Sequence, residues 1–192
     1  MEGCMTALIG GLVGVVLLFI LWYVWTANNL IAKRNRVRQC RSSICVVLKQ
    51  RNDLIPNLVA SVKTYMGHES EVLVRIAELR SRLSSSSSEG ELIRAGGELS
   101  SLLSRLNVSV EDYPELKADG QFHRLQANIE EMELQLQAIR RTYNAAVTDY
   151  NNAIEMFPSS VVARRQRHVE EPLVEIPEEE RRNVDVAGLF GR

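Results

Sequence analysis

The chain of 192 residues has a mass of 21.7 kDa and a formal net charge of −1, with 23 Lys and Arg against 24 Asp and Glu. This length suits one ordinary domain with attachments, and the balanced charge argues against a general nucleic-acid-binding protein, which should carry a basic excess. The three cysteines, Cys4, Cys40 and Cys45, exclude a disulfide framework and a four-cysteine zinc site.

The first predicted element is a membrane-spanning helix over residues 5–25, after a short extracytoplasmic N-terminus at residues 1–4. This segment contains no charged residue, and at 1.5 Å per residue it spans about 31 Å, the thickness of a bilayer hydrocarbon core. Trp22 and Trp25 at its end are typical of the membrane interface. Gly10 and Gly14 form a G-x-x-x-G pair, which favours contact with a second membrane helix, although glycine is common in membrane helices in any case.

A basic juxtamembrane stalk is predicted at residues 26–43. Its basic side chains are Lys33, Arg34, Arg36, Arg38 and Arg41. No acidic residue occurs before Asp53 on this side, so the positive-inside rule places the stalk in the cytoplasm and the N-terminus outside. We expect these side chains to bind the headgroups of anionic lipids.

Helical periodicity of the apolar residues predicts that residues 44–157 form an all-α, antiparallel up-and-down bundle of four helices. The membrane helix should continue into the first of these, with a kink at Pro56 and an end near Gly67. A second helix is expected over residues 69–83. A serine-rich loop over residues 84–88 then leads to a third helix that ends near Asp112.

The last helix of the bundle shows the clearest pattern. Apolar residues alternate steps of three and four from Phe122 to Phe157, which is a heptad seam, and Pro158 ends it. Asp119 is the expected N-cap. Residues 158–192 are charged and poor in apolar side chains, so we expect a flexible tail. The alternative is that the stretch EPLVEIP, residues 171–177, docks on a partner as an extended peptide.

Polar residues interrupt the apolar faces of the first and last bundle helices. They are Arg51, Asp53 and Asn57 around Pro56, and Arg140, Arg141 and Asn144. We expect a buried hydrogen-bonded network that fixes helix register, with Asp53 paired to Arg140 or Arg141. A notch for a partner or ligand beside Pro56 is the alternative. The nearby Glu130, Glu131 and Glu133 are interpreted as a solvated face.

The sequence contains no recognisable catalytic constellation. It has no HExxH helix, phosphate-binding loop, dinucleotide fingerprint or GxSxG turn, and none of its three histidines follows a glutamate by three positions. We therefore predict no catalytic, cofactor-binding or metal-binding residues, and a protein that is not an enzyme.

Three stretches, residues 50–69, 103–126 and 140–158, resemble the LemA family of bacterial membrane proteins. With the anchor, the resemblance covers about residues 5–160, while the serine loop and the acidic tail look particular to this chain. It implies a single-pass protein of the bacterial cytoplasmic membrane with a cytoplasmic helical bundle and no established enzymatic activity.

We therefore expect a membrane-anchored scaffold that needs no cofactor and self-associates. Its expected partners are an anionic lipid bilayer, further copies of the chain and, as a further option, another membrane protein. The alternative is an adaptor or regulatory subunit of a membrane protease or signalling system, which would act through the bundle or the tail.

Overall fold

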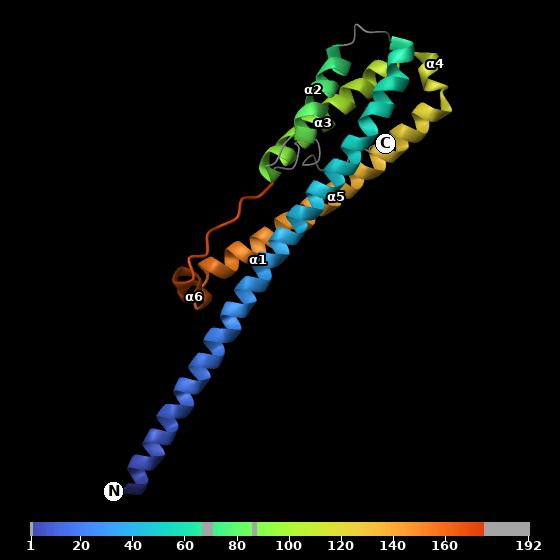
Figure 1. Cartoon of the computed structure of the whole chain (residues 1–192). Helices are drawn as coiled ribbons and strands as arrows, with labels where there is room; N and C mark the ends of the chain where they lie inside the picture. Colours follow the sequence, from blue (N-terminus) through green and yellow to red (C-terminus); the bar gives the residue numbers. More distant parts are fainter. Residues whose placement is uncertain (1, 67–70, 86–87, 175–192) are drawn as a thin grey trace, which may run out of the picture. The chain divides into compact units, whose positions relative to one another are not determined.

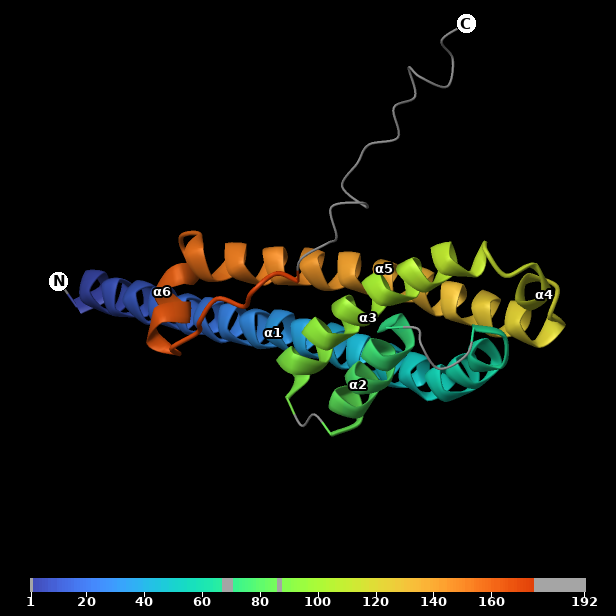
Figure 2. The ribbon, with the colours of Figure 1, turned by 90° about the horizontal axis from the view of Figure 1, so that it is seen from above.

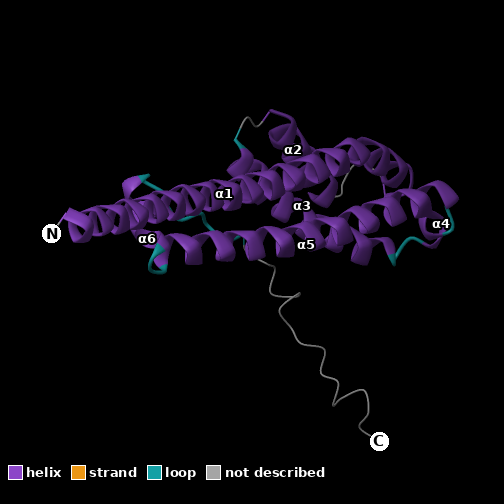
Figure 3. Ribbon diagram, turned by 90° about the horizontal axis from the view of Figure 1, so that it is seen from below, coloured by secondary structure: helices purple, strands orange, loops and turns teal. Residues whose placement is uncertain are grey.

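The computed structural model describes residues 2–66, 71–85 and 88–174, and within these ranges its regular structure is α-helical without strands (Figure 3). The helices shown in Figure 1 are α1 (Glu2–Met66), α2 (Glu71–Ser85), α3 (Glu89–Val110), α4 (Pro114–Lys117), α5 (Gly120–Glu155) and α6 (Ser159–Arg165). The predicted all-α class is confirmed, and α2, α3 and α5 begin and end within a few residues of their predicted limits.

Helix α1 runs as one element from the apolar N-terminal segment into the bundle, as predicted. Pro56 lies inside α1, and the helix continues beyond it to Met66. A proline removes one backbone donor from a helix. The apolar positions on both sides, such as Ile55 and Leu58, are buried and hold this part of α1 in place.

The chain forms two compact units, and α1 and α5 each contribute to both. The first unit contains residues 1–39 and 142–192, and the second contains residues 40–141. The division falls inside the predicted stalk (26–43) and again inside the predicted bundle (44–157). Helices α1 and α5 are much longer than α2 and α3, and each contains residues of both units.

The core of the second unit is built from the apolar faces of its helices. In α1 the fully buried side chains include Ile44, Leu48 and Val62. Helix α2 packs along α3 (Figure 2), and each buries a leucine-rich stripe. The stripes are Leu73, Ile76, Leu79 and Leu83 on α2, and Leu92, Leu99, Leu103 and Leu106 on α3.

Most of the predicted seam of α5 is buried, from Phe122 to Tyr150. Met132, Ile139 and Ala153 are half-buried, and the side chain of Phe157 is 82% exposed. Helix α5 ends at Glu155, so Phe157 lies in the turn before α6 rather than on the seam. In the sequence, the heptad pattern therefore extends two residues beyond Glu155, where helix α5 ends.

The predicted flexible tail is wrong for residues 159–174. Residues Ser159–Arg165 form α6, in which Val162 and Ala163 are buried, and residues 166–174 run back along the first unit (Figure 1). A helix of two turns shows too little periodicity to be recognised, and the segment after it has none. Residues 175–192 of the predicted tail and 86–87 of the predicted serine loop lie outside the described residues.

Candidate functional site

The N-terminal part of α1 is the part of the described chain that is long and apolar enough to cross a membrane. Its large side chains, such as Leu12, Leu18 and Phe19, are exposed, whereas the core helix of a soluble protein would bury them. Trp22 is half-buried and Trp25 is exposed at the end of the apolar run. This helix is compatible with a single-pass membrane protein.

Gly10 and Gly14 leave open space beside this helix. A Cβ atom built at either residue has no neighbouring heavy atom within 4 Å. The two glycines are four positions apart and therefore share one face of α1. The backbone at this face is accessible to another helix at close range.

The predicted lipid-binding residues have different surroundings. Arg36 and Arg38 are exposed, and Lys33 and Arg34 are half-buried in the first unit. Arg41 lies in the second unit, where its Nε is 3.2 Å from Oε2 of Glu89. Of this group, Arg36 and Arg38 are the most accessible to a headgroup.

Arg51 is fully buried in the second unit, and its guanidinium binds groups from α3 and α5. Nη1 donates to Oγ of Ser100 at 2.7 Å and to the carboxylate of Glu133, and Nη2 donates to the carbonyl of Gly96 at 2.6 Å. Oγ of Ser100 donates to the same carboxylate at 2.9 Å. Arg140, also buried, has its Nη1 3.8 Å from the other oxygen of Glu133. One carboxylate thus connects α1, α3 and α5.

Two buried arginines share this carboxylate, whose side chain is 26% exposed. Burial lowers the pKa of Arg51, the Glu133 charge opposes that shift, and the charge of Arg140 adds to it. Arginine nevertheless stays protonated in proteins. The desolvation of such a cluster offsets much of its attraction, so its main effect is to fix the arrangement of the helices.

The predicted network therefore contains Arg51 and Arg140, but the predicted pairing of Asp53 is wrong. Asp53, Asn57 and Arg141 are exposed, and Pro56 is half-buried. The acidic partner is Glu133, which was interpreted as part of a solvated face. Glu133 and Arg140 are seven positions apart, and this spacing places both on one face of α5. That spacing was the signal that could have identified the pair.

Asn144, also predicted for this network, makes a different contact in the first unit. Its side-chain amide accepts from the backbone N–H of Val174 at 3.0 Å and donates to its carbonyl at 2.9 Å. Asn151 makes the same pair of bonds with the backbone of Glu171, both at 3.0 Å. The hydroxyl of Tyr143 donates to the carbonyl of Pro172 at 2.9 Å. We refer to residues 166–174 as the strap.

The geometry of this contact follows from two repeat lengths. Asn144 and Asn151 are seven helical residues apart, which corresponds to about 10.5 Å along α5. Glu171 and Val174 are three residues apart, which corresponds to about 10 Å in an extended chain. The strap therefore runs antiparallel to α5 in register with the two asparagines, and it is held through its main chain. Its Leu173 side chain is exposed.

His168 fixes the other end of the strap. The hydroxyl of Tyr150 lies 2.9 Å from Nδ1 of His168, and Nε2 lies 3.0 Å from Oε1 of Gln166. Because the Gln166 oxygen can only accept, Nε2 carries the proton and Nδ1 accepts from Tyr150. Burial and, secondarily, the charge of Arg34 lower the pKa of His168. The ring is therefore neutral at neutral pH.

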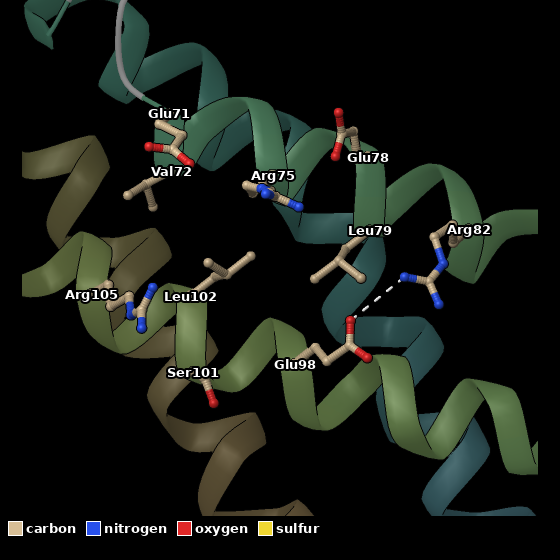
Figure 4. A pocket seen from close by; sticks show the side chains of 10 residues that line it. All are labelled: Glu71, Val72, Arg75, Glu78, Leu79, Arg82, Glu98, Ser101, Leu102 and Arg105. Atoms are coloured by element: carbon tan, nitrogen blue, oxygen red, sulfur yellow. Dashed lines mark ion pairs between the residues drawn. The ribbon is translucent and has the colours of Figure 1, made fainter.

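An open groove of about 470 Å³ lies between α2 and α3 (Figure 4). Its charged lining residues are Glu71, Arg75, Glu78, Arg82, Glu98 and Arg105. Arg82 and Glu98 form an ion pair at 3.5 Å across it. Because acidic and basic residues are equal in number, the groove gives no electrostatic preference for a ligand of either sign.

These features define a class of protein: a helical bundle on a single N-terminal helix that is compatible with a membrane anchor. The sequence model of the LemA family matches residues 41–187, and the chain belongs to the LemA family. It is 27% identical over 173 residues to Protein LemA of Metamycoplasma hominis, an alignment that covers 90% of this chain and 79% of that protein.

The comparisons confirm the resemblance and correct its extent. The family match continues to residue 187, well beyond the predicted limit near residue 160. The strap, the acidic segment as far as residue 187 and the serine loop at residues 84–88 therefore lie inside the matched region. LemA is not a known enzyme family.

Proposed function

We propose that this protein is a membrane-anchored scaffold that self-associates in the bacterial cytoplasmic membrane and organises lipids or membrane proteins there. The observation that carries the proposal is the apolar N-terminal segment of α1, whose large side chains are exposed and which a bilayer would cover. The basic residues that follow it, including Arg36 and Arg38, favour a cytoplasmic bundle and an N-terminus outside.

Self-association is supported by the G-x-x-x-G pair of Gly10 and Gly14, which share one face of α1. Two copies of α1 that met at this face would bring their backbones close together, as small-residue faces of membrane helices do. Leucine at both positions would separate the helices and remove that packing.

The test measures the mass distribution of the full-length protein in lipid nanodiscs, together with cross-linking in native membranes. We expect oligomers for the wild type and an association weaker by about tenfold, or about 1.4 kcal/mol, for the Gly10→Leu/Gly14→Leu variant. Val16→Leu, which adds bulk on another face of α1, is the matched control. A protein that is monomeric in native membranes would overturn the proposal.

A second candidate function is that of an adaptor or regulatory subunit of another membrane protein, such as a protease or a signalling system. The strap favours it, because Asn144 and Asn151 bind the main chain of an extended segment, a mode also used between proteins. Deletion of residues 159–192 separates the two functions: an adaptor would lose one specific partner, whereas self-association through α1 would persist.

A further inference from the structure

The turn between α5 and α6 and the start of α6 expose large apolar side chains in one short stretch. Met156 is 64% exposed, Phe157 82% and Val161 59%. Exposed apolar side chains that are grouped in this way mark a surface that a membrane or another molecule covers.

Helix α6 extends this surface with basic side chains. Ser160, Val162 and Ala163 are buried against the first unit, whereas Val161, Arg164 and Arg165 are exposed. The exposed positions follow the spacing i, i+3, i+4 and therefore form one outward face. The chain presents apolar groups at the turn and guanidinium groups directly after them.

This surface lies beside the end of the membrane segment, within the same unit. On α1 the exposed apolar run ends at Trp25, and burial begins at Thr26 and Ala27. Arg34 and Arg38 act electrostatically on Tyr150, so these residues lie at a similar level along the unit. From Tyr150, α5 continues antiparallel to α1 for five residues, or about 7.5 Å, toward the level of Trp25. Figures 1 and 2 both show α6 beside α1.

We propose that Met156, Phe157 and Val161 form a second membrane contact, which inserts into the interfacial layer of the same bilayer that holds α1, while Arg164 and Arg165 bind anionic headgroups. The inference rests on the proposed membrane anchoring. Aromatic and aliphatic side chains beside arginines are the composition of segments that lie in this layer.

The exposed area favours lipid over a protein partner. Three side chains of this size offer roughly 400 Å², about half of the 800 Å² that each partner buries in a stable protein complex. A surface already tethered to the bilayer by α1 loses little further translational freedom on insertion, so this area suffices for a lipid contact.

The test uses tryptophan fluorescence of the full chain in phosphatidylcholine and phosphatidylglycerol vesicles with brominated acyl chains. Phe157→Trp is introduced in a background with Trp22→Phe and Trp25→Phe. We expect blue-shifted emission and at least about twofold quenching by bromine, because bromine quenches only at contact. Val108→Trp in the same background is the matched control, because Val108 is 73% exposed on α3, in the other unit. We expect it to be unquenched.

A third protein with Trp22→Phe alone reports on the anchor through native Trp25. Quenching at Trp25 with none at position 157, or equal quenching at positions 157 and 108, would overturn the second contact and leave the anchor intact. Absence of quenching at Trp25 would overturn the anchor itself. Blue-shifted emission at position 157 without quenching would show a protein contact and would also overturn the proposal.

The Arg164→Gln/Arg165→Gln variant tests the headgroup contact. It should reduce the quenching at position 157 only when phosphatidylglycerol is present. Unchanged quenching would refute the contact between these arginines and anionic headgroups.

Discussion

The side chain of Leu48 on α1 lies against the backbone of Gly96 on α3. A Cβ atom at residue 96 would come within 2.5 Å of Cδ2 of Leu48, which is itself buried. We expect Gly96→Ala to lower the free energy of unfolding by about 1–3 kcal/mol, the usual cost of overpacking a core, in spite of the better helix propensity of alanine. Thermal unfolding of the purified protein measures this.

Gly97 is the matched control for that substitution, because it is the next residue of the same helix and a Cβ there has no neighbour within 4 Å. Gly97→Ala should raise the free energy of unfolding by up to about 1 kcal/mol through helix propensity alone. If both alanine variants changed stability in the same direction, the close approach of α1 and α3 at Gly96 would be refuted.

Glu133 is the carboxylate that two buried arginines share, so its replacement should be costly. Glu133→Gln keeps the size of the side chain and removes the charge that pairs with Arg51 and Arg140. We expect a loss of about 3 kcal/mol, because both guanidinium groups stay buried without a counter-charge. Glu131→Gln, an exposed position on the same helix, should change stability by less than about 0.5 kcal/mol. Equal stability of the two variants would contradict the assigned role of Glu133.

The strap should detach when its two amide contacts are removed. In the Asn144→Ala/Asn151→Ala variant, the backbone N–H groups of Glu171 and Val174 lose their acceptors. Amide hydrogen exchange at these two residues should accelerate at least about tenfold, while the core of the second unit keeps its protection. Asn152→Ala, at an exposed position, should leave the exchange unchanged. Unaltered protection of Glu171 in the double variant would argue against this contact.

The strap should also loosen in acid, because the folded structure favours neutral His168. The folded pKa of His168 lies below the ordinary value of about 6.5. Its contribution to stability is therefore complete above about pH 6.5 and is lost as the pH falls through the lower, folded pKa. Exchange of the Glu171 amide, corrected for its intrinsic pH dependence, should rise between pH 7.5 and 5.

Two histidine variants test the origin of that pH response. His168→Gln should remove it, whereas His123→Gln, at an exposed position on α5, should leave it in place. A pH response that survives in His168→Gln would assign the effect to another group.

The long helices could be predicted because each has a local cause in the sequence, whereas the short helices α4 and α6 could not. The apolar stripe and the charge-free run give α1, and Asp119 gives the start of α5. The Oδ1 atom of Asp119 accepts from the backbone N–H of Gln121 at 2.7 Å and of Phe122 at 3.3 Å, and these bonds lower its pKa. The predicted N-cap is confirmed by this geometry.

The candidate sites were harder to predict, because their partners are set by tertiary contacts. Asp53 was predicted to pair with Arg140 or Arg141, yet the helical period places Asp53 on the exposed face of α1. The strap is held by main-chain groups of Glu171 and Val174, which every residue type except proline provides. Such a contact leaves no side-chain pattern in the strap itself.

Recognition through the main chain sets which changes in the strap the protein can accept. Side chains at Glu171, Leu173 and Val174 can vary widely, and proline is compatible with position 172 but not with 171 or 174, where an N–H must donate. Inserting or deleting a single residue between Glu171 and Val174 would move one of the two donors by about 3.3 Å relative to its asparagine. During evolution, the side chains of the strap can therefore change, whereas the number of residues between Glu171 and Val174 must stay the same.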